Sequence, residues 1–315
     1  MHSSEKPARR SPRRSSRSGA ATSRIVGDSE MAELIRNFDW GTTELGAIEG
    51  WSNTLLTTVN MLLASRHPMF LWWGPELIQF YNDGYRPSIR ADKHPAAVGQ
   101  RGVECWPEIW PIIGPQIEAA MTRGDSSWNA NQLVPIYRDG RLEEVFWTYS
   151  YSPVRDEHGT VQGTLVVCSE TTDQVVSERR LRALLGIAID PQEREQTTSG
   201  ASLAARMRTV VSTLDGALAD LPFTLLFLLD DEQIRNAGST ATLASLNAAS
   251  AWPLAKVADS RAPRLLTDLT TRFGEITGHP WPEPVTRAYL LPLNMQGVRL
   301  RAVMVFRHQS SPAFR

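Results

Sequence analysis

Cysteine is scarce in this sequence. Only two cysteines occur in 315 residues, Cys105 and Cys168, and they lie far apart, without the close spacing of a zinc-binding pair. A chain with so few cysteines does not depend on a framework of disulfides, and a reducing compartment suits it. The sequence therefore predicts a cytoplasmic protein without a metal site.

Long apolar runs and an excess of charge are also missing. No apolar segment approaches the roughly eighteen residues that a membrane-spanning helix needs. The formal net charge of -1 gives no general attraction to nucleic acid or to an anionic membrane. We therefore expect no nucleic-acid partner and no membrane partner. The composition, with 42% hydrophobic and 21% charged residues, is that of a globular protein long enough for two domains.

Sequence motifs of catalysis are missing as well. The chain contains no phosphate-binding loop, no nucleophile elbow and no metalloprotease motif. Its six histidines lie in the N-terminal tail, beside prolines, in a turn and near the C-terminus, rather than on an amphipathic helix. We therefore predict that this chain is not an enzyme.

The chain begins with a basic, serine-rich segment. Residues 1–27 carry one lysine and six arginines against a single acid, Glu5. Such a segment buries too little apolar surface to offset the entropy lost on ordering, so we predict a disordered tail. A targeting signal and an arm that binds nucleic acid are the alternatives.

The next part of the sequence alternates between helical and strand patterns. Helical spacing of apolar residues predicts helices near residues 28–37 and 51–65. An apolar hairpin follows over residues 69–81, with its turn at Gly74-Pro75. After short, proline-broken helical pieces, a helix is expected near residues 116–122.

A β-meander closes this first region. Its two turns are predicted at Asp139-Gly140 and at residues 156–159. Together with the earlier hairpin it predicts one five-stranded antiparallel sheet between residues 66 and 172, with helices on one face. The last strand ends at Glu170-Thr171-Thr172 and leads directly into a charged helix, predicted over residues 173–190.

A series of short motifs runs through residues 31–185. They are Asp39-Trp40, Trp73-Gly74-Pro75-Glu76-Leu77, Tyr81-Asn82-Asp83, Lys93-His94-Pro95, Trp106-Pro107-Glu108-Ile109-Trp110 and Glu170-Thr171-Thr172. With these motifs, the segment resembles the PAS domain that opens many bacterial-type sensor histidine kinases. The resemblance implies a PAS domain over residues 28–172 and an α+β fold.

A second unit is predicted over residues 200–315. It combines an amphipathic helix from Leu203 to Leu214, a buried strand at residues 221–229 and further strands near residues 264–267, 288–294 and 298–307. This order resembles a GAF domain, which commonly follows the PAS domain in the related kinases. The resemblance implies a GAF-like α/β sandwich, and we expect it to be truncated because the chain ends at Arg315, just after the last strand.

Cofactor binding is the next question that the resemblance raises. Cys105 lies in about the region where flavin photosensors of the PAS superfamily carry a reactive cysteine, but the Asn-Cys-Arg-Phe-Leu-Gln context of those photosensors is missing. His94 is a candidate axial ligand of haem, although a packing or capping role fits its place beside Pro95 better. We predict no cofactor and a buried, inert thiol at Cys105.

The aromatic residues of the first region indicate either a filled core with a partner-binding sheet face or a small pocket for an apolar or aromatic ligand. Alternation places Phe146 and Thr148 on one face of their strand and Trp147 and Tyr149 on the other. Asn82 and Asp83 are predicted to gate the pocket or to cap a turn. The candidate pocket residues are Phe70, Trp72, Tyr81, Asn82, Asp83, Tyr85, Trp106, Trp110, Phe146 and Thr148.

Signal output is assigned to the end of the sheet and the helix that follows. The output residues are Glu170, Thr171, Thr172, Leu181 and Leu184. An apolar stripe on residues 173–188 predicts a short coiled coil and a weak dimer, and a histidine kinase is the alternative partner.

We therefore expect a sensory input module of two-component signalling, either as a fragment of a kinase or as a separate protein that modulates one. It binds a small ligand of unspecified chemistry or a partner and passes the signal through this helix. The alternative is a stand-alone ligand-binding or protein-interaction scaffold without a phosphorelay role.

Overall fold

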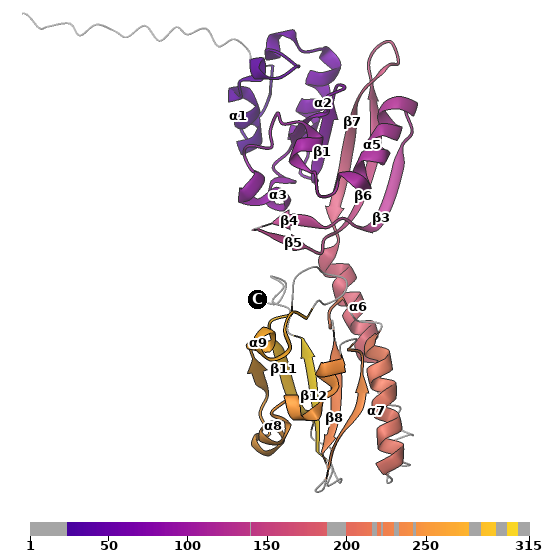
Figure 1. Ribbon diagram of the computed structural model, residues 1–315. Coiled ribbons are helices and arrows are strands. Elements are labelled where there is room, and N and C mark those ends of the chain that lie inside the picture. The colour runs from indigo at the N-terminus through magenta and orange to yellow at the C-terminus, as the bar shows by residue number, and fades with distance from the viewer. Residues whose placement is uncertain are drawn as a thin grey trace, which may run out of the picture. The chain divides into compact units, whose positions relative to one another are not determined.

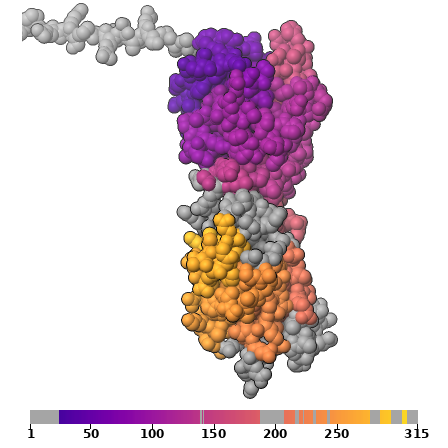
Figure 2. Space-filling view, in the orientation of Figure 1, coloured from indigo at the N-terminus to yellow at the C-terminus, as the bar shows by residue number. Residues whose placement is uncertain are grey.

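The chain forms two compact units, Met1–Glu170 and Thr171–Arg315. The structure is a computed structural model that describes residues 24–138, 140–187, 200–215, 219–221, 223–229, 233–241, 244–276, 285–293 and 301–307. Figure 1 shows the elements of both units, and Figure 2 shows their surfaces, with the first unit in indigo to magenta and the second in orange to yellow.

A five-stranded antiparallel sheet forms the centre of the first unit, as predicted. Its strands follow the order β2-β1-β7-β6-β3. They are β1 (Met69–Trp73), β2 (Ile78–Tyr81), β3 (Ser127–Leu133), β6 (Phe146–Arg155) and β7 (Val161–Glu170).

The predicted meander differs in one detail. The turn at Gly140, where φ is +73°, joins a separate two-stranded hairpin and not two strands of the main sheet. This hairpin consists of β4 (Ile136–Arg138) and β5 (Arg141–Glu143). Asp139, the other residue of the predicted turn, lies outside the described residues.

The helices of the first unit begin where the sequence supplies side-chain caps. Ser29 accepts a hydrogen bond from the Ala32 N–H at the start of α1, and Ser52 accepts one from the Leu55 N–H at the start of α2. Gly124, with φ +70°, ends α5. The helices are α1 (Glu30–Asn37), α2 (Asn53–Ala64), α3 (Arg86–Lys93), α4 (Gly102–Cys105) and α5 (Trp110–Arg123), with 3-10 turns at Trp40–Thr42 and Ile48–Gly50.

Helical segments cover both faces of this sheet, so the prediction that they lie on one face is wrong. Strand register places Tyr81 and Tyr149 on one face, and there Gln116 of α5 donates to the Tyr149 hydroxyl at 3.1 Å. Phe80 points to the opposite face, where the Trp40 ring stacks on it with centroids 4.8 Å apart. The reason is that β1 and β2 are buried at every position, so both of their faces need cover.

The N-terminal tail ends earlier than predicted. Arg24 donates to the Ile48 and Glu49 carbonyls, the Val26 N–H donates to the Asn60 side chain, and Ile25 is fully buried. Residues 24–27 therefore belong to the folded unit, because Ile25 supplies an apolar anchor that the arginine count alone does not reveal. The rest of the predicted tail lies outside the described residues.

The second unit also has a five-stranded antiparallel sheet, in the order β10-β11-β12-β8-β9. Its strands are β8 (Thr224–Leu229), β9 (Ile234–Ser239), β10 (Arg264–Leu266), β11 (Ala288–Leu293) and β12 (Arg301–Arg307). Its helices are α6 (Thr172–Ile187), α7 (Gly200–Asp215), α8 (Leu254–Ser260) and α9 (Leu269–Phe273), with 3-10 turns at Ala244–Asn247 and Ala249–Ala251. The predicted helix and strands are present, whereas β9 was not predicted.

The sheet of the second unit buries apolar residues on both faces. Leu225 and Phe227 of β8 contact a core that includes Trp252 and Leu254. The alternate residues of the same strand, such as Leu226, contact α7. The burial of β8 at every position agrees with the prediction of a buried strand, although β12 and not β8 lies at the centre of the sheet.

None of the helices in the described part of the chain has both the length and the apolar character needed to cross a bilayer.

Candidate functional site

Five of the predicted pocket residues meet between the sheet and helices α3 to α5. Phe70 is their centre, and its ring centroid lies 4.6 Å from that of Trp72 and 5.1 Å from that of Tyr85. Tyr81 and Trp106 contact the same ring at 6.0 and 6.4 Å. All five are buried, so the prediction that they lie together is correct, and their rings fill much of the layer they share.

Three aromatic residues complete this layer, and the sequence did not assign them to it. Trp147 stacks on Tyr85 at 5.7 Å, and Tyr151 contacts Trp72 at 5.9 Å and Tyr149 at 5.0 Å. Alternation in β6 showed that these three share a face. Alternation did not show that this face is the one toward helices α3 to α5.

Phe146 and Thr148 lie on the opposite face of the sheet and do not belong to the layer. Both are only partly buried, and the Thr148 hydroxyl accepts a hydrogen bond from the Asn131 N–H at 3.0 Å. The alternation was predicted correctly, but the inward face was chosen wrongly. The register of β6 with β7, which pairs Tyr151 with Val166, decides the face.

The tyrosines of the layer remain hydrogen-bond donors. Burial raises the pKa of Tyr85 and of Tyr151 well above the usual value for a phenol. Burial also raises the pKa of Tyr81, with a smaller contribution from the neighbouring Cys105. The layer therefore presents neutral hydroxyls and apolar ring faces.

Asn82 holds a turn rather than gating a pocket. Its Oδ1 accepts hydrogen bonds from the Met69 and Tyr85 N–H groups at 3.0 and 3.1 Å. Its Nδ2 donates to the carbonyls of Leu62, Ser65 and His67 at distances between 2.8 and 3.1 Å. The side chain is fully buried, so of its two predicted roles the structural one agrees with its contacts.

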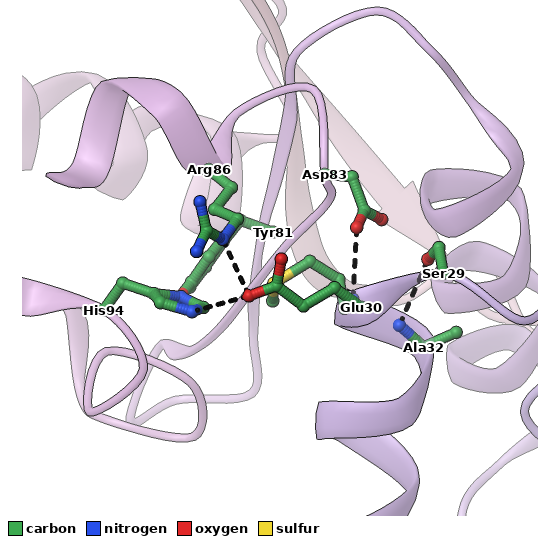
Figure 3. Close-up of polar contacts among 8 residues, drawn as sticks. Ser29, Glu30, Ala32, Tyr81, Asp83, Arg86 and His94 are labelled. Carbon is green, nitrogen blue, oxygen red and sulfur yellow. Dashed lines mark hydrogen bonds and ion pairs between the residues drawn. The ribbon is translucent and has the colours of Figure 1, made fainter. Parts of the chain in front are cut away.

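Asp83 and Glu30 tie the first helix to the pocket wall. Asp83 accepts a hydrogen bond from the Met31 N–H at 3.2 Å. The Glu30 carboxylate lies 2.8 Å from Arg86 Nε and 3.2 Å from His94 Nε2 (Figure 3). The other ring nitrogen of His94 meets the Tyr81 hydroxyl at 2.9 Å, so a chain of polar contacts links α1 to the aromatic layer.

These contacts decide the role of His94. Both of its ring nitrogens are engaged, one with Tyr81 and one with Glu30, which agrees with a packing histidine and leaves no nitrogen for a haem iron. Within the described residues, no three side chains of His, Cys, Asp and Glu gather as a metal site.

Trp106 is fixed by polar neighbours. Its indole N–H donates to Gln79 at 3.1 Å, and the Lys93 ammonium lies 4.1 Å from its ring centroid. Lys93 also pairs with Glu108 at 2.6 Å. The adjacent Cys105 is buried, and burial raises its thiol pKa, as expected for an inert thiol.

Glu170, the last residue of the sheet, is about a third exposed and forms an ion pair with a buried arginine. Its two carboxylate oxygens accept from the two terminal nitrogens of Arg138 at 3.0 and 3.3 Å. The Arg138 side chain is only 4% exposed, and Glu143 lies 3.6 Å from it. The hairpin β4–β5 is therefore tied to the end of β7, and Arg138 is a residue that sequence reasoning did not single out.

Helix α6 begins directly after this ion pair. Its first hydrogen bond runs from the Val175 N–H to the Thr171 carbonyl, and Thr172 is its first residue. Arg179 and Arg180 donate to Asp220 at 2.6 and 3.1 Å.

The leucines of α6 face away from this contact. Leu181 and Leu184 are 56% and 61% exposed. These two leucines share an outward face with Leu185, whereas Val176, which was predicted to lie on the same stripe, is buried. The arginines, expected to lie off the stripe, hold the helix to its own unit.

A comparison with known protein families identifies the region that contains this site. Residues 77–176 match a family described as PAS fold. This part of the chain is a PAS domain, in agreement with the predicted resemblance. A comparison with curated proteins gave no match.

Solved structures with a similar fold include sensory proteins. One is a sensory box sensor histidine kinase from Vibrio cholerae, with 16% identity over 37% of this chain and 89% of the other, at a TM-score of 0.28. The LOV protein of Rhodobacter sphaeroides matches with 14% identity over 53% and 95%, at 0.32. The PAS domain of BvgS from Bordetella pertussis matches with 15% identity over 42% and 97%, at 0.26. Values this low support no inference about function.

Proposed function

We propose that this chain is a sensory input module of two-component signal transduction. Its PAS domain binds a small ligand or a partner, and helix α6 passes the change to a histidine kinase. The observation that carries the proposal is the ion pair between Arg138 and Glu170, because it holds the last residue of the sheet, two residues before the helix begins.

The ion pair suits this role because its cation is buried and shared. Arg138 lies between Glu143 of its own hairpin and Glu170 of β7. Removing Glu170 leaves the buried Arg138 with Glu143, at a cost of about 1.5–3 kcal/mol for the lost hydrogen bonds to a charged group. Any movement of the hairpin therefore acts on Glu170 and on the first turn of α6.

The aromatic layer is the proposed source of that movement. Tyr85 stacks on Trp147, and Trp147 is directly paired with Glu170 across the two strands. A ligand or partner that displaces these rings would displace the strand pair that carries Glu170. The coupling depends on packing: the Trp147 ring and the strand pair β6–β7 are rigid neighbours that move together.

Dimerisation through α6 is the proposed form of the output. Leu181, Leu184 and Leu185 form an exposed apolar stripe that spans less than one heptad, which is short for an independent coiled coil. A second copy of the helix would bury the stripe in a weak dimer, and the dimerising helices of a kinase are the alternative occupant.

For the second unit we propose a GAF-like domain. Its antiparallel sheet with α7 on one face and short helices on the other supports this. We also propose that the chain is not itself an enzyme and acts in the cytoplasm, where its two buried free thiols remain reduced.

The exposed indole of Trp128 favours a second candidate, a protein-interaction scaffold. Trp128 lies on the outward face of β3 and is 69% exposed. A large aromatic residue with its face in water is typical of a contact surface for another protein.

The two functions are separated by fusing a histidine kinase core to the C-terminus of the whole chain. For an input module, Glu170→Gln changes autophosphorylation about fivefold or more, because the buried Arg138 keeps Glu143 but loses the charge of Glu170. Glu157→Gln, in the exposed β6–β7 loop, is the matched control and changes nothing. Equal activity of all three proteins would favour the scaffold.

A further inference from the structure

A groove opens in the first unit between α5, the turn from β1 to β2, and the start of β7. Its volume is about 680 Å³, within the range of small-molecule sites. The walls are mainly apolar, with Leu77, Trp110, Ile117, Met121 and Val161 among them. Glu118 is the one charged residue among those that line it. Such a lining suits an uncharged, mostly apolar molecule and disfavours an anion.

Two buried polar groups without partners lie next to the floor of this groove. The floor includes Gly74 and Gln162, which are joined by a backbone hydrogen bond of 2.8 Å. Two residues further along each strand, on the same face of the sheet, stand Trp72 and Thr164, which are directly opposite each other. Trp72 is 5% exposed and Thr164 is 0% exposed.

Neither Trp72 Nε1 nor Thr164 Oγ1 has a hydrogen-bond partner within the described part of the chain. A buried donor left unpaired costs about 1–3 kcal/mol, so it calls for an acceptor.

The Trp110 ring separates the groove from this unpaired donor. A Cβ atom at Gly102 would lie 2.7 Å from Trp72 Nε1 and 3.2 Å from Trp110 Cη2, so the two indoles converge over a glycine. A Cβ atom at Gly114 would lie 2.9 Å from Trp110 Nε1. Trp110 therefore packs against two glycines. A rotation of the Trp110 side chain would be needed to join the groove to the Trp72 N–H.

We propose that this groove binds a neutral, mainly apolar small molecule through one hydrogen-bond acceptor, such as a carbonyl oxygen, which the Trp72 indole N–H recognises. The Thr164 hydroxyl supplies a second contact, and Trp110 closes over the ligand. The inference rests on the proposed sensory function, since it names the class of ligand that the module detects.

Three probes of similar ring size test the class of ligand on the full-length, ¹⁵N-labelled protein. Acetophenone carries a neutral acceptor, ethylbenzene carries none, and benzoate carries a charge. Acetophenone should shift the Trp72 indole N–H resonance and bind about tenfold more tightly than ethylbenzene, the difference expected for one hydrogen bond. Benzoate should bind at least tenfold more weakly than acetophenone. Equal affinities for acetophenone and ethylbenzene would overturn the proposal.

A pair of variants tests which indole N–H donates the hydrogen bond to the ligand. Trp72→Phe keeps a ring but removes the N–H, so the preference for acetophenone over ethylbenzene should disappear. Trp128→Phe removes an indole N–H from the other face of the sheet, where the side chain is 69% exposed, and should keep the tenfold preference. If Trp128→Phe abolishes the preference and Trp72→Phe does not, the site is elsewhere.

Two further variants complete the test. The indole resonances of the other tryptophans report whether Trp72→Phe is folded. If the Trp72→Phe variant is not folded, Thr164→Val takes its place. This variant should reduce the preference for acetophenone over ethylbenzene by about threefold, and an unchanged preference would count against the proposal. Val161→Trp fills the groove and should remove binding of all three probes.

If no probe binds up to millimolar concentration, the unpaired groups hold only water and the inference fails. The kinase-fusion experiment uses no added ligand, so the proposed function can stand when this inference fails.

Discussion

The two units have the same strand order and different interiors. Numbered by position along the chain, the five strands of each main sheet lie in the order 2-1-5-4-3. In the first unit the sheet face toward α5 carries tyrosine and tryptophan side chains. In the second unit the interior strand β8 carries leucines and Phe227, all buried. One topology therefore supports two kinds of core.

Buried polar groups sharpen this contrast. In the first unit, Trp72, Ser127, Trp147 and Thr164 each place an unpartnered polar atom on the same sheet face. In the second unit, Thr224 is the one such residue on the described part of the sheet. A face with several unpaired donors can recognise a ligand through hydrogen bonds, whereas a uniformly apolar face contributes to the stability of the fold. This difference is why the candidate site is assigned to the first unit.

The largest expected effect is the loss of stability after a substitution in the core of the second unit. Phe227→Ala removes a fully buried ring from β8 and should cost about 3–5 kcal/mol of the unfolding free energy of the second unit. Hydrogen–deuterium exchange, read residue by residue, should show faster exchange in β8 and β12. The amides of β1 and β7 should keep their protection, and joint loss in both sheets would show that the units do not fold independently.

The next effect concerns the turn that precedes the candidate site. Asn82→Ala removes a fully buried side chain that bonds five backbone groups, so the first unit should lose about 3 kcal/mol. Urea unfolding followed by tryptophan fluorescence measures the change. Asn60→Ala is the control, because its bonds to Arg24 and Val26 are exposed, and it should cost no more than about 1 kcal/mol. Equal costs would contradict the role assigned to Asn82.

Substitution of the exposed leucines of α6 tests whether this helix forms a dimer. Replacing Leu181 and Leu184 together with Glu should leave the unfolding free energy within about 0.5 kcal/mol, because both side chains are exposed. Sedimentation at tens of micromolar should show the unmodified chain as a weak dimer and the variant as a monomer. A monomeric unmodified chain would restrict α6 to the role of a linker.

Strand positions were predictable from the sequence because alternation and turn residues are local signals. The hairpin of β1 and β2 and the strands β6, β7, β8, β11 and β12 fall where those signals place them. The face that Phe146 and Thr148 occupy was not predictable, since alternation separates two faces without saying which one is covered. The Trp40 ring covers Phe80 on one face of the sheet, and these two residues are forty positions apart in the sequence.

The polar contacts of the site were harder to predict for the same reason. Arg138 and Glu170 are separated by 32 residues, and neither stands in a pattern that marks a buried ion pair. Glu30 and His94 are separated by 64 residues. Only the register of the strands and the packing of α1 bring such partners together, so pairings of this kind need the three-dimensional structure.

The coupling between the sheet and α6 is tested most directly by hydrogen–deuterium exchange in the first turn of that helix. The measurement compares the Val175 amide in the unmodified chain, in Glu170→Gln and in the control Glu157→Gln. If the Arg138–Glu170 ion pair anchors the start of the helix, Glu170→Gln should speed exchange of this amide about tenfold, while Glu157→Gln leaves it unchanged. Equal exchange rates in all three proteins would contradict the account, because the helix would then begin independently of the sheet.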